Sequence, residues 1–155
     1  FTVLMPDPDL RGKENDLYLA SALAEKPTVL AYAASTQASE LGPHVGTAQL
    51  GGDPLEWLLT YPGILRQLPL LSISAEGKGI VNSSPEVDGV VRRLPVVVGS
   101  EGKIYPSFAL EMLRLAVGDP SYQIKTGDTG VEWIRVPNYP NMNTDANGFI
   151  WIKFF

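Results

Sequence analysis

The sequence predicts an α/β fold: a mixed central sheet with helices packed on it, a βαβ unit at the start and β-hairpins towards the C-terminus. Strand, helix and strand patterns follow one another in residues 2–32, which is typical of a parallel strand pair. Residues 79–116 combine two strands, a polar turn and a helix with clear start and stop signals. Residues 121–155 alternate short apolar runs with turn residues, as β-structure does.

The first third of the chain is predicted to form the βαβ unit. Residues 2–5 are apolar and are expected to form a short strand. Asp16 suits a helix N-cap, and apolar residues recur at helical spacing after it until Pro27. Residues 28–32 are predicted to be a strand buried on both faces. Residues 33–53 are then expected to form a long loop, of the kind that often carries function.

The next segment is predicted to be mostly helical. Residues 55–59 and 64–68 are expected to form short helical turns. Residues 70–75 fit a helix or a strand, and helix is favoured because Pro69 suits a first turn and Gly77 suits the end of a helix.

Residues 79–116 form the best-defined unit in the sequence. The elements expected here are a strand (79–82), a turn (83–89), a strand that Pro95 places at an edge or bulge (90–98), a hairpin turn (99–102) and a helix that Ser107 caps. In that helix, an apolar stripe that includes Phe108 and Met112 is predicted to face the core. Glu111 and Arg114 are predicted to face solvent.

The C-terminal part is predicted to be β-structure. Residues 123–125 and 131–136 are expected to form a hairpin, and residues 148–155 a strand that is apolar on both faces. The loop that starts at Asn143 follows part of the ligand spacing of a calcium loop, but Phe154 occupies the place of the bidentate glutamate. A polar turn is therefore the favoured interpretation.

The composition is that of one globular domain. The chain has 155 residues, of which 45% are hydrophobic and 19% charged, and a chain of this length buries about two-thirds of the surface that its unfolded form exposes. We therefore expect one domain over residues 1–155, with no cofactor and no metal. Both ends lie in apolar segments, Phe1 and Phe154-Phe155, so each is interpreted as a cut through a larger protein.

Charge and cysteine content exclude several classes of function. The net charge of −5 argues against nucleic acid as a partner, because contact with phosphates requires a basic surface. The sequence contains no cysteine, which excludes disulfides and thiolate catalysis. His44 is the only histidine, and no G-x-S-x-G motif accompanies it. A surface or locally bonded histidine is the favoured interpretation of His44, and a catalytic or sensing role, for example in sensing pH, is the alternative.

The charges inside residues 79–116 are the main candidate site. Arg92 and Arg93 are consecutive in a predicted strand, so their side chains point to opposite faces and one of them turns inward. An inward arginine needs a carboxylate partner, and Asp88, Glu86 and Asp9 are the candidates. A structural ion pair is the favoured interpretation, and a clamp for an anion or carboxylate is the alternative.

Three motifs follow one another in residues 79–110: Gly79-Ile-Val-Asn82, Asp88-Gly-Val-Val-Arg92-Arg93-Leu-Pro95 and Tyr105-Pro-Ser-Phe-Ala-Leu110. This ordered set resembles the second type of CHASE domain, the sensory extracellular domain associated with cyclases and histidine kinases. Residues 1–24 also fit the family, whose usual flanking segments are missing, so the domain is expected to be truncated at both ends.

The resemblance implies an input domain on the periplasmic or extracellular side of a membrane-anchored bacterial receptor, joined to a nucleotide cyclase or histidine kinase. It implies no catalytic residue, no cofactor and no assigned ligand, so the signal is an unknown small molecule or protein. The matched positions carry a structural or ligand-facing role only: Asn82, Asp88, Gly89, Arg92, Pro95, Pro106 and Ser107. The candidate ligand-binding residues are Asn82, Asp88, Arg92, Arg93 and His44.

Two other functions stay open at this stage. One is a structural dimerisation module, in which the apolar segments 1–5 and 148–155 pair between the chains of a homodimer. The other is a metal-dependent hydrolase that uses Asp7, Asp9 and Asp88.

Overall fold

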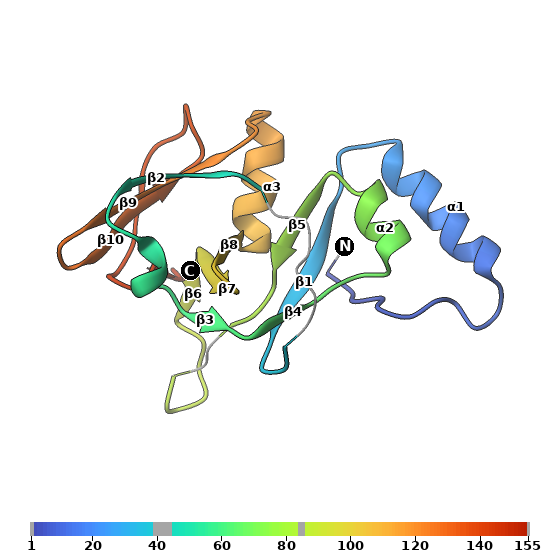
Figure 1. Cartoon of the computed structure of the whole chain (residues 1–155), viewed down its shortest axis with the longest axis horizontal. Coiled ribbons are helices and arrows are strands. Elements are labelled where there is room, and N and C mark those ends of the chain that lie inside the picture. Colours follow the sequence, from blue (N-terminus) through green and yellow to red (C-terminus); the bar gives the residue numbers. More distant parts are fainter. Residues whose placement is uncertain (1, 39–44, 84–85, 155) are drawn as a thin grey trace.

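The computed structural model describes residues 2–38, 45–83 and 86–154 (Figure 1). The elements of this part of the chain are α1 (Lys13–Ala24), β1 (Val29–Ser35), β2 (Thr47–Gly51), the 3-10 turn η1 (Pro54–Glu56), β3 (Thr60–Tyr61), β4 (Gly63–Leu65), α2 (Pro69–Ser74), β5 (Gly77–Ile80), β6 (Arg93–Pro95), β7 (Val97–Ser100), β8 (Lys103–Pro106), α3 (Phe108–Val117), β9 (Tyr122–Gly127), β10 (Gly130–Arg135), β11 (Met142–Asn143) and β12 (Phe149–Trp151). Mixed sheets with helices packed on them confirm the predicted α/β fold.

Helix α3 lies between two sheets (Figure 1). On one side the strand order is β4-β1-β5, with β1 parallel to β5 and antiparallel to β4. On the other side the order is β11-β10-β9-β2, with β9 and β10 forming an antiparallel hairpin. Two smaller sheets, β12-β6 and β3-β7-β8, complete the pairing. Helices α1 and α2 cover the side of β1 and β5 that faces away from α3 (Figure 1).

The core divides along the same lines. One apolar cluster joins α1 and α2 to β1, through Ala20, Leu30 and Leu71 among others. A larger cluster joins the β9–β10 hairpin to the start of α3, with Ile124 and Leu110 among its buried members. A helix placed between two sheets must bury two of its faces (Figure 1).

The predicted βαβ start is wrong. Residues 2–5 form no strand; instead the Gln67 side chain takes the place of a neighbouring strand. Its Nε2 donates to the Val3 carbonyl at 2.8 Å and to the Ala31 carbonyl at 2.7 Å, and its Oε1 accepts from the Met5 N–H at 2.6 Å. The parallel partner of β1 is therefore β5, much later in the chain.

Four other predictions for the first half are corrected. Helix α1 begins at Lys13, so Asp16 lies in its first turn and is not the N-cap. The Asp16 carboxylate accepts the N–H of Asp9, which precedes the helix. The predicted loop 33–53 contains the end of β1 and all of β2. The predicted helix 64–68 is wrong: its first two residues belong to β4, which pairs with β1. A short apolar run does not distinguish a strand from a helix. Gly77 begins β5 rather than ending α2.

The predicted strand 90–98 is wrong: it begins only at Arg93 and is divided at Val96 into β6 and β7, which pair in different sheets. Several other predictions from Pro69 onwards are confirmed. Helix α2 begins at Pro69, and the β7–β8 and β9–β10 hairpins form where expected. Glu101 and Gly102 both have positive φ (47° and 74°), as a two-residue hairpin turn requires. The last strand is shorter than predicted: β12 covers only Phe149–Trp151 and pairs with β6 alone among the described strands.

Candidate functional site: an apolar pocket beside α3

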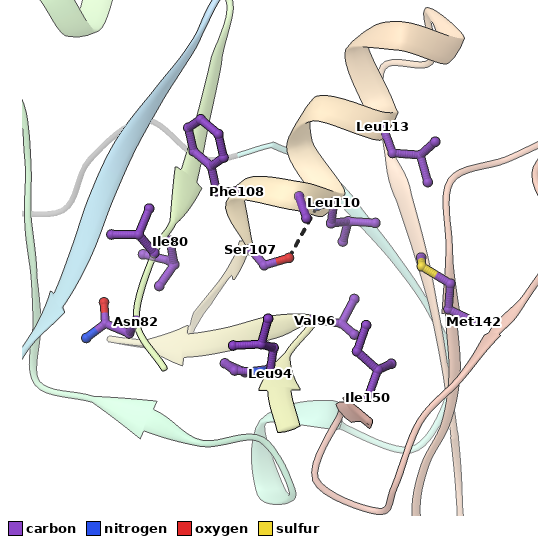
Figure 2. A pocket seen from close by; sticks show the side chains of 13 residues that line it. Ile80, Asn82, Leu94, Val96, Ser107, Phe108, Leu110, Leu113, Met142 and Ile150 are labelled. Atoms are coloured by element: carbon purple, nitrogen blue, oxygen red, sulfur yellow. Dashed lines mark hydrogen bonds between the residues drawn. The ribbon is translucent and has the colours of Figure 1, made fainter. Parts of the chain in front are cut away.

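A pocket of about 450 Å³ lies beside the start of α3, between the end of β5 and the segment that joins β6 to β7 (Figure 2). Ser107 builds one wall by starting the helix: its Oγ accepts the Leu110 N–H at 3.3 Å. The first turns of α3 then present Leu110 and Leu113 to the pocket. Because these side chains belong to a capped helix packed between two sheets, the wall is built on a fixed element.

The other walls come from segments that are far apart in the sequence. Leu94 and Val96 lie across the pocket from α3, and Ile150 of β12 lies beside them (Figure 2). Met142 of β11 lies at one end, and Ile80 of β5 lies at the other (Figure 2). The pairing of β12 with β6 holds two of these walls together.

Asn82 also lines the pocket, but its amide is already engaged. Its Oδ1 accepts the Ala34 N–H at 2.6 Å and its Nδ2 donates to the Ala34 carbonyl at 3.0 Å. The side chain thus extends the pairing of β1 beyond the end of β5, as another strand residue would. Asn82 positions this wall.

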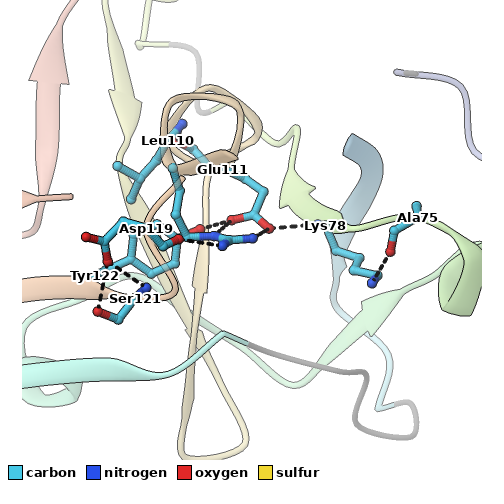
Figure 3. A network of polar contacts seen from close by, with 9 residues as sticks. Ala75, Lys78, Leu110, Glu111, Asp119, Ser121 and Tyr122 are labelled. Carbon is cyan, nitrogen blue, oxygen red and sulfur yellow. Dashed lines mark hydrogen bonds and ion pairs between the residues drawn. The ribbon is translucent and has the colours of Figure 1, made fainter. Parts of the chain in front are cut away.

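The opposite side of α3 carries a buried polar network (Figure 3). Glu111 is fully buried; its carboxylate accepts from Nε and Nη2 of Arg114, both at 2.9 Å, and from the hydroxyl of Tyr122 on β9. It also accepts the backbone N–H of Lys78 on β5 at 3.2 Å. Arg114 then donates to the Asp119 carbonyl at 2.7 Å. One carboxylate therefore ties α3 to both flanking sheets.

This network corrects the predicted orientation of α3. Glu111 and Arg114 were expected in solvent and are buried, whereas Met112, expected in the core, is exposed. The charged pair is buried because each charge neutralises the other and the remaining oxygen lone pairs find donors. Gly79 allows the close packing, since a Cβ there would collide with the backbone of Phe108.

Burial and charge shift the pKa values around the network. The hydrogen bonds that Arg114 donates to the Glu111 carboxylate raise the pKa of Arg114, so this guanidinium stays charged. Burial lowers the pKa of Lys78, whose amine donates to the Ala75 carbonyl at 2.6 Å. Burial also raises the pKa of Tyr32, whose hydroxyl is hydrogen-bonded to Ser72.

The predicted arginine site forms a separate, exposed cluster. Nη1 and Nη2 of Arg92 donate to the Asp88 carboxylate, at 2.9 and 2.6 Å, and this contact lowers the pKa of the Asp88 carboxyl. Arg93 pairs with Glu86 at 2.9 Å and with Asp145 at 3.2 Å. The partners Asp88 and Glu86 are as predicted; Asp9 is not one of them, because it accepts bonds from its own loop.

Arg93 also lies over two aromatic rings of β12, 5.7 Å from the centroid of Phe149 and 5.4 Å from that of Trp151.

Asp145, the second carboxylate partner of Arg93, accepts the N–H groups of Asn147 and Phe149. It does so in the polar turn whose spacing partly resembles that of a calcium loop. The Asp145 carboxylate is thus committed to a turn and an ion pair.

The predicted site residues are therefore not brought together. Asn82 lines the apolar pocket, whereas Asp88, Arg92 and Arg93 belong to the exposed cluster, and His44 lies outside the described residues. Within residues 2–38, 45–83 and 86–154, no three His, Asp or Glu side chains gather to hold a metal ion. In the same residues, no helix is long and apolar enough to cross a membrane.

Sequence reasoning missed the pocket and the Glu111 network. The available signal for a buried pair was the spacing of Glu111 and Arg114, three residues apart on a predicted helix. Gly77 and Gly79, in the strand that packs on this helix, were a second sign. The pocket had no such signal, because its walls meet only through the pairing of β12 with β6 and of β10 with β11.

The comparisons with known proteins give one result. No curated protein and no solved structure matches the chain significantly. The family model of the CHASE2 domain, an extracellular sensory domain, matches residues 1–155, the whole chain. The chain therefore belongs to the CHASE2 domain family.

Proposed function

We propose that this chain is the signal-input domain of a membrane-anchored bacterial signal-transduction protein, such as a nucleotide cyclase or a histidine kinase, and that it lies on the periplasmic or extracellular side. The observation that carries this proposal is the family match over all 155 residues. The domain senses and does not catalyse, and the reaction belongs to the output domain of the parent protein.

The position of α3 supports a mechanism for this role. One side of the helix contacts the pocket through Leu110 and Leu113, and the other side is tied to both sheets through Glu111. A signal that favours one placement of α3 therefore shifts the population between two packings of the domain. Flanking segments of the parent protein carry this shift to the output domain.

The location can be tested by cysteine labelling, because the chain has no cysteine of its own. Ile73 on α2 is 81% exposed, so an Ile73→Cys variant of the parent protein offers an accessible thiol within the domain, and the unsubstituted parent protein is the control for labelling elsewhere. A membrane-impermeant maleimide should label it in intact cells whose outer layer admits the reagent. Labelling only after the cells are lysed would place the domain in the cytoplasm and contradict the proposal.

The sequence of the parent protein provides a second test. We expect a membrane span near residues 1–155 and a cyclase or kinase domain on the other side of it. Cytoplasmic enzyme domains on both sides of the chain, with no span between, would refute the sensory role.

A homodimerisation module is the second candidate function. It is favoured by β12, which pairs with β6 only among the described strands and carries the exposed side chain of Trp151. Light scattering over a dilution series should then show a dimer that dissociates, and a Trp151→Glu variant should stay monomeric. A wild-type monomer at the highest concentration would remove this candidate.

A further inference from the structure

We propose that the pocket beside α3 binds a neutral, mainly apolar small molecule, and that this molecule is the signal of the domain. The first half of the proposal, binding, stands on the pocket itself. The second half, signalling, rests on the proposed function.

The size and construction of the pocket suit a small ligand. Its volume of about 450 Å³ lies within the roughly 300–1,000 Å³ of ligand pockets in proteins. Most of its walls belong to regular elements, namely the capped start of α3, the end of β5, and the paired strands β6 and β12, and Val81, Asn82 and Val96 lie in the connections next to them. The space is therefore held open by hydrogen-bonded backbone rather than by one mobile side chain.

The charge of the lining selects the class of ligand. Among the described residues that line the pocket, none is charged, and only Asn82 and Ser107 are polar. An ionised ligand group would lose its hydration here without gaining an opposite charge, which is costly. The arginines closest in sequence, Arg92 and Arg93, are paired with carboxylates and do not line the pocket. The ligand is therefore neutral.

One hydroxyl group gives the pocket a polar contact. The Ser107 oxygen accepts the Leu110 N–H, and it lies on the pocket side of α3 (Figure 2). A serine hydroxyl that accepts one hydrogen bond still has a proton to donate, and no described residue takes it. A ligand with one carbonyl, ether or hydroxyl oxygen on an apolar body fits this arrangement.

The pocket is also placed where occupancy changes the packing of α3. Leu110 is buried between the pocket and the β9–β10 core, and the next residue, Glu111, holds both sheets. A bound molecule contacts the helix at its first two turns and thereby favours one position of it.

A matched pair of dyes tests the class of ligand. Anilinonaphthalene is neutral and apolar and fluoresces when it leaves water, and its sulfonated analogue differs by one negative charge. Titration of the 155-residue chain should give saturable binding of the neutral dye at one site per chain. Binding of the sulfonated dye should be at least tenfold weaker. Equal binding of both dyes, or no saturation, would overturn the proposal.

Two alanine positions on α3 locate the dye. Ala109 lines the pocket and Ala116 does not, and both are exposed, so a larger side chain is tolerated at each. Ala109→Trp should weaken binding of the neutral dye at least tenfold, and Ala116→Trp should leave it unchanged. Circular dichroism melting curves verify that both variants fold. Undiminished binding to Ala109→Trp would place the dye elsewhere and refute the assignment.

A variant at the rim provides a second measurement. Val81 lines the pocket and is partly exposed, so Val81→Asp adds a negative charge without removing core packing. It should weaken binding of the neutral dye severalfold. If Val81→Asp bound the neutral dye as tightly as the wild-type chain does, the claim that binding depends on an uncharged pocket lining would be contradicted.

The parent protein separates the two halves of the proposal. Binding to the parent with a change in its output supports both halves. Binding without a change in output refutes the proposed function as a sensor of this ligand while the site stands. Binding to the chain but not to the parent means that a segment of the parent occupies the pocket, which refutes the ligand site and leaves the sensory role intact.

Discussion

Two arginine–carboxylate clusters use the same chemistry in opposite surroundings. The Glu111–Arg114 pair on α3 is buried, with side-chain exposures of 0% and 9%. The Arg92 and Arg93 side chains are 41% and 37% exposed. Both clusters include carboxylates hydrogen-bonded at 2.9 Å or less, so geometry alone does not separate them.

Burial decides what each cluster does. An exposed pair exchanges contact with water for contact with its partner, so its net contribution to stability is small. A buried pair has already lost its hydration, so removing one partner leaves an uncompensated charge. The exposed cluster accordingly fixes a turn, whereas the buried cluster holds α3, the helix that forms one wall of the pocket. Arg92 and Arg93, which the sequence analysis selected, are therefore expected to contribute less to the stability of the fold than the Glu111–Arg114 pair.

The largest effect is expected from breaking the buried pair. Glu111→Ala strands the Arg114 charge and removes the acceptor for Tyr122 and for the Lys78 N–H. We expect a loss of about 3–5 kcal/mol in the free energy of unfolding, measured by urea denaturation.

The matched control is an exposed glutamate on a strand. Glu132→Ala on β10 should change the free energy of unfolding by less than about 0.5 kcal/mol. Similar losses for the two variants would mean that the burial of Glu111 does not set the size of the loss.

The next effect comes from forcing α3 away from β5. A Cβ at Gly79 would meet the backbone of Phe108 and lie 3.0 Å from the Ser107 carbonyl carbon, and backbone cannot rotate aside. Gly79→Ala should cost about 1–3 kcal/mol. Gly46→Ala is the control, because nothing lies within 4 Å of the added methyl group. Equal thermal midpoints for the two variants would contradict the tight packing of α3 on β5.

A smaller effect is expected in the exposed cluster. Arg93→Ala removes two ion pairs and the contacts with the rings of Phe149 and Trp151. Because the Arg93 side chain is 37% exposed, water screens these contacts, and the loss in the free energy of unfolding should be well below that of Glu111→Ala. A loss as large as that of Glu111→Ala would show that this cluster is a structural centre after all.

The smallest effect concerns acid stability. The hydrogen bonds from Arg92 and from the Val90 N–H lower the pKa of Asp88 below its ordinary value of 3.8. A lowered pKa contributes stability that is fully present above the ordinary value and is lost as pH falls through the lowered one. Asp88→Asn should therefore reduce the melting temperature slightly at neutral pH. The difference should vanish in acid, and a constant difference down to the lowest pH would contradict this assignment.

Local signals in the sequence predicted the elements that depend on local chemistry. Ser107 and Gly118 delimit α3 by capping it, and Pro69 starts α2. The β7–β8 and β9–β10 hairpins follow from their turn residues. These features need only neighbours a few residues away, which is why one sequence suffices to predict them.

Long-range partners explain the failures. Residues 2–5 have a strand-like pattern, but Gln67 takes the place of a neighbouring strand. Glu111 is a typical solvent residue until Tyr122 and Lys78 are brought to it. In the candidate site, Asn82 lies beside the pocket because its amide pairs with the backbone of Ala34, a contact with a residue 48 positions away that no local pattern predicts.

The course of β2 has a consequence for how the chain folds. Strand β2 lies in the sequence between β1 and β4, which pair with each other, yet it pairs in parallel with β9 in the other sheet. Bringing β2 and β9 together closes the long segment between Gly51 and Tyr122. The loss of chain entropy comes first, and only the completed strand pairing offsets it. The β11-β10-β9-β2 sheet is incomplete until β9 has been synthesised, so a nascent chain released before β9 carries an unpaired β2. We expect folding to be slow and to depend on synthesis of nearly the whole chain.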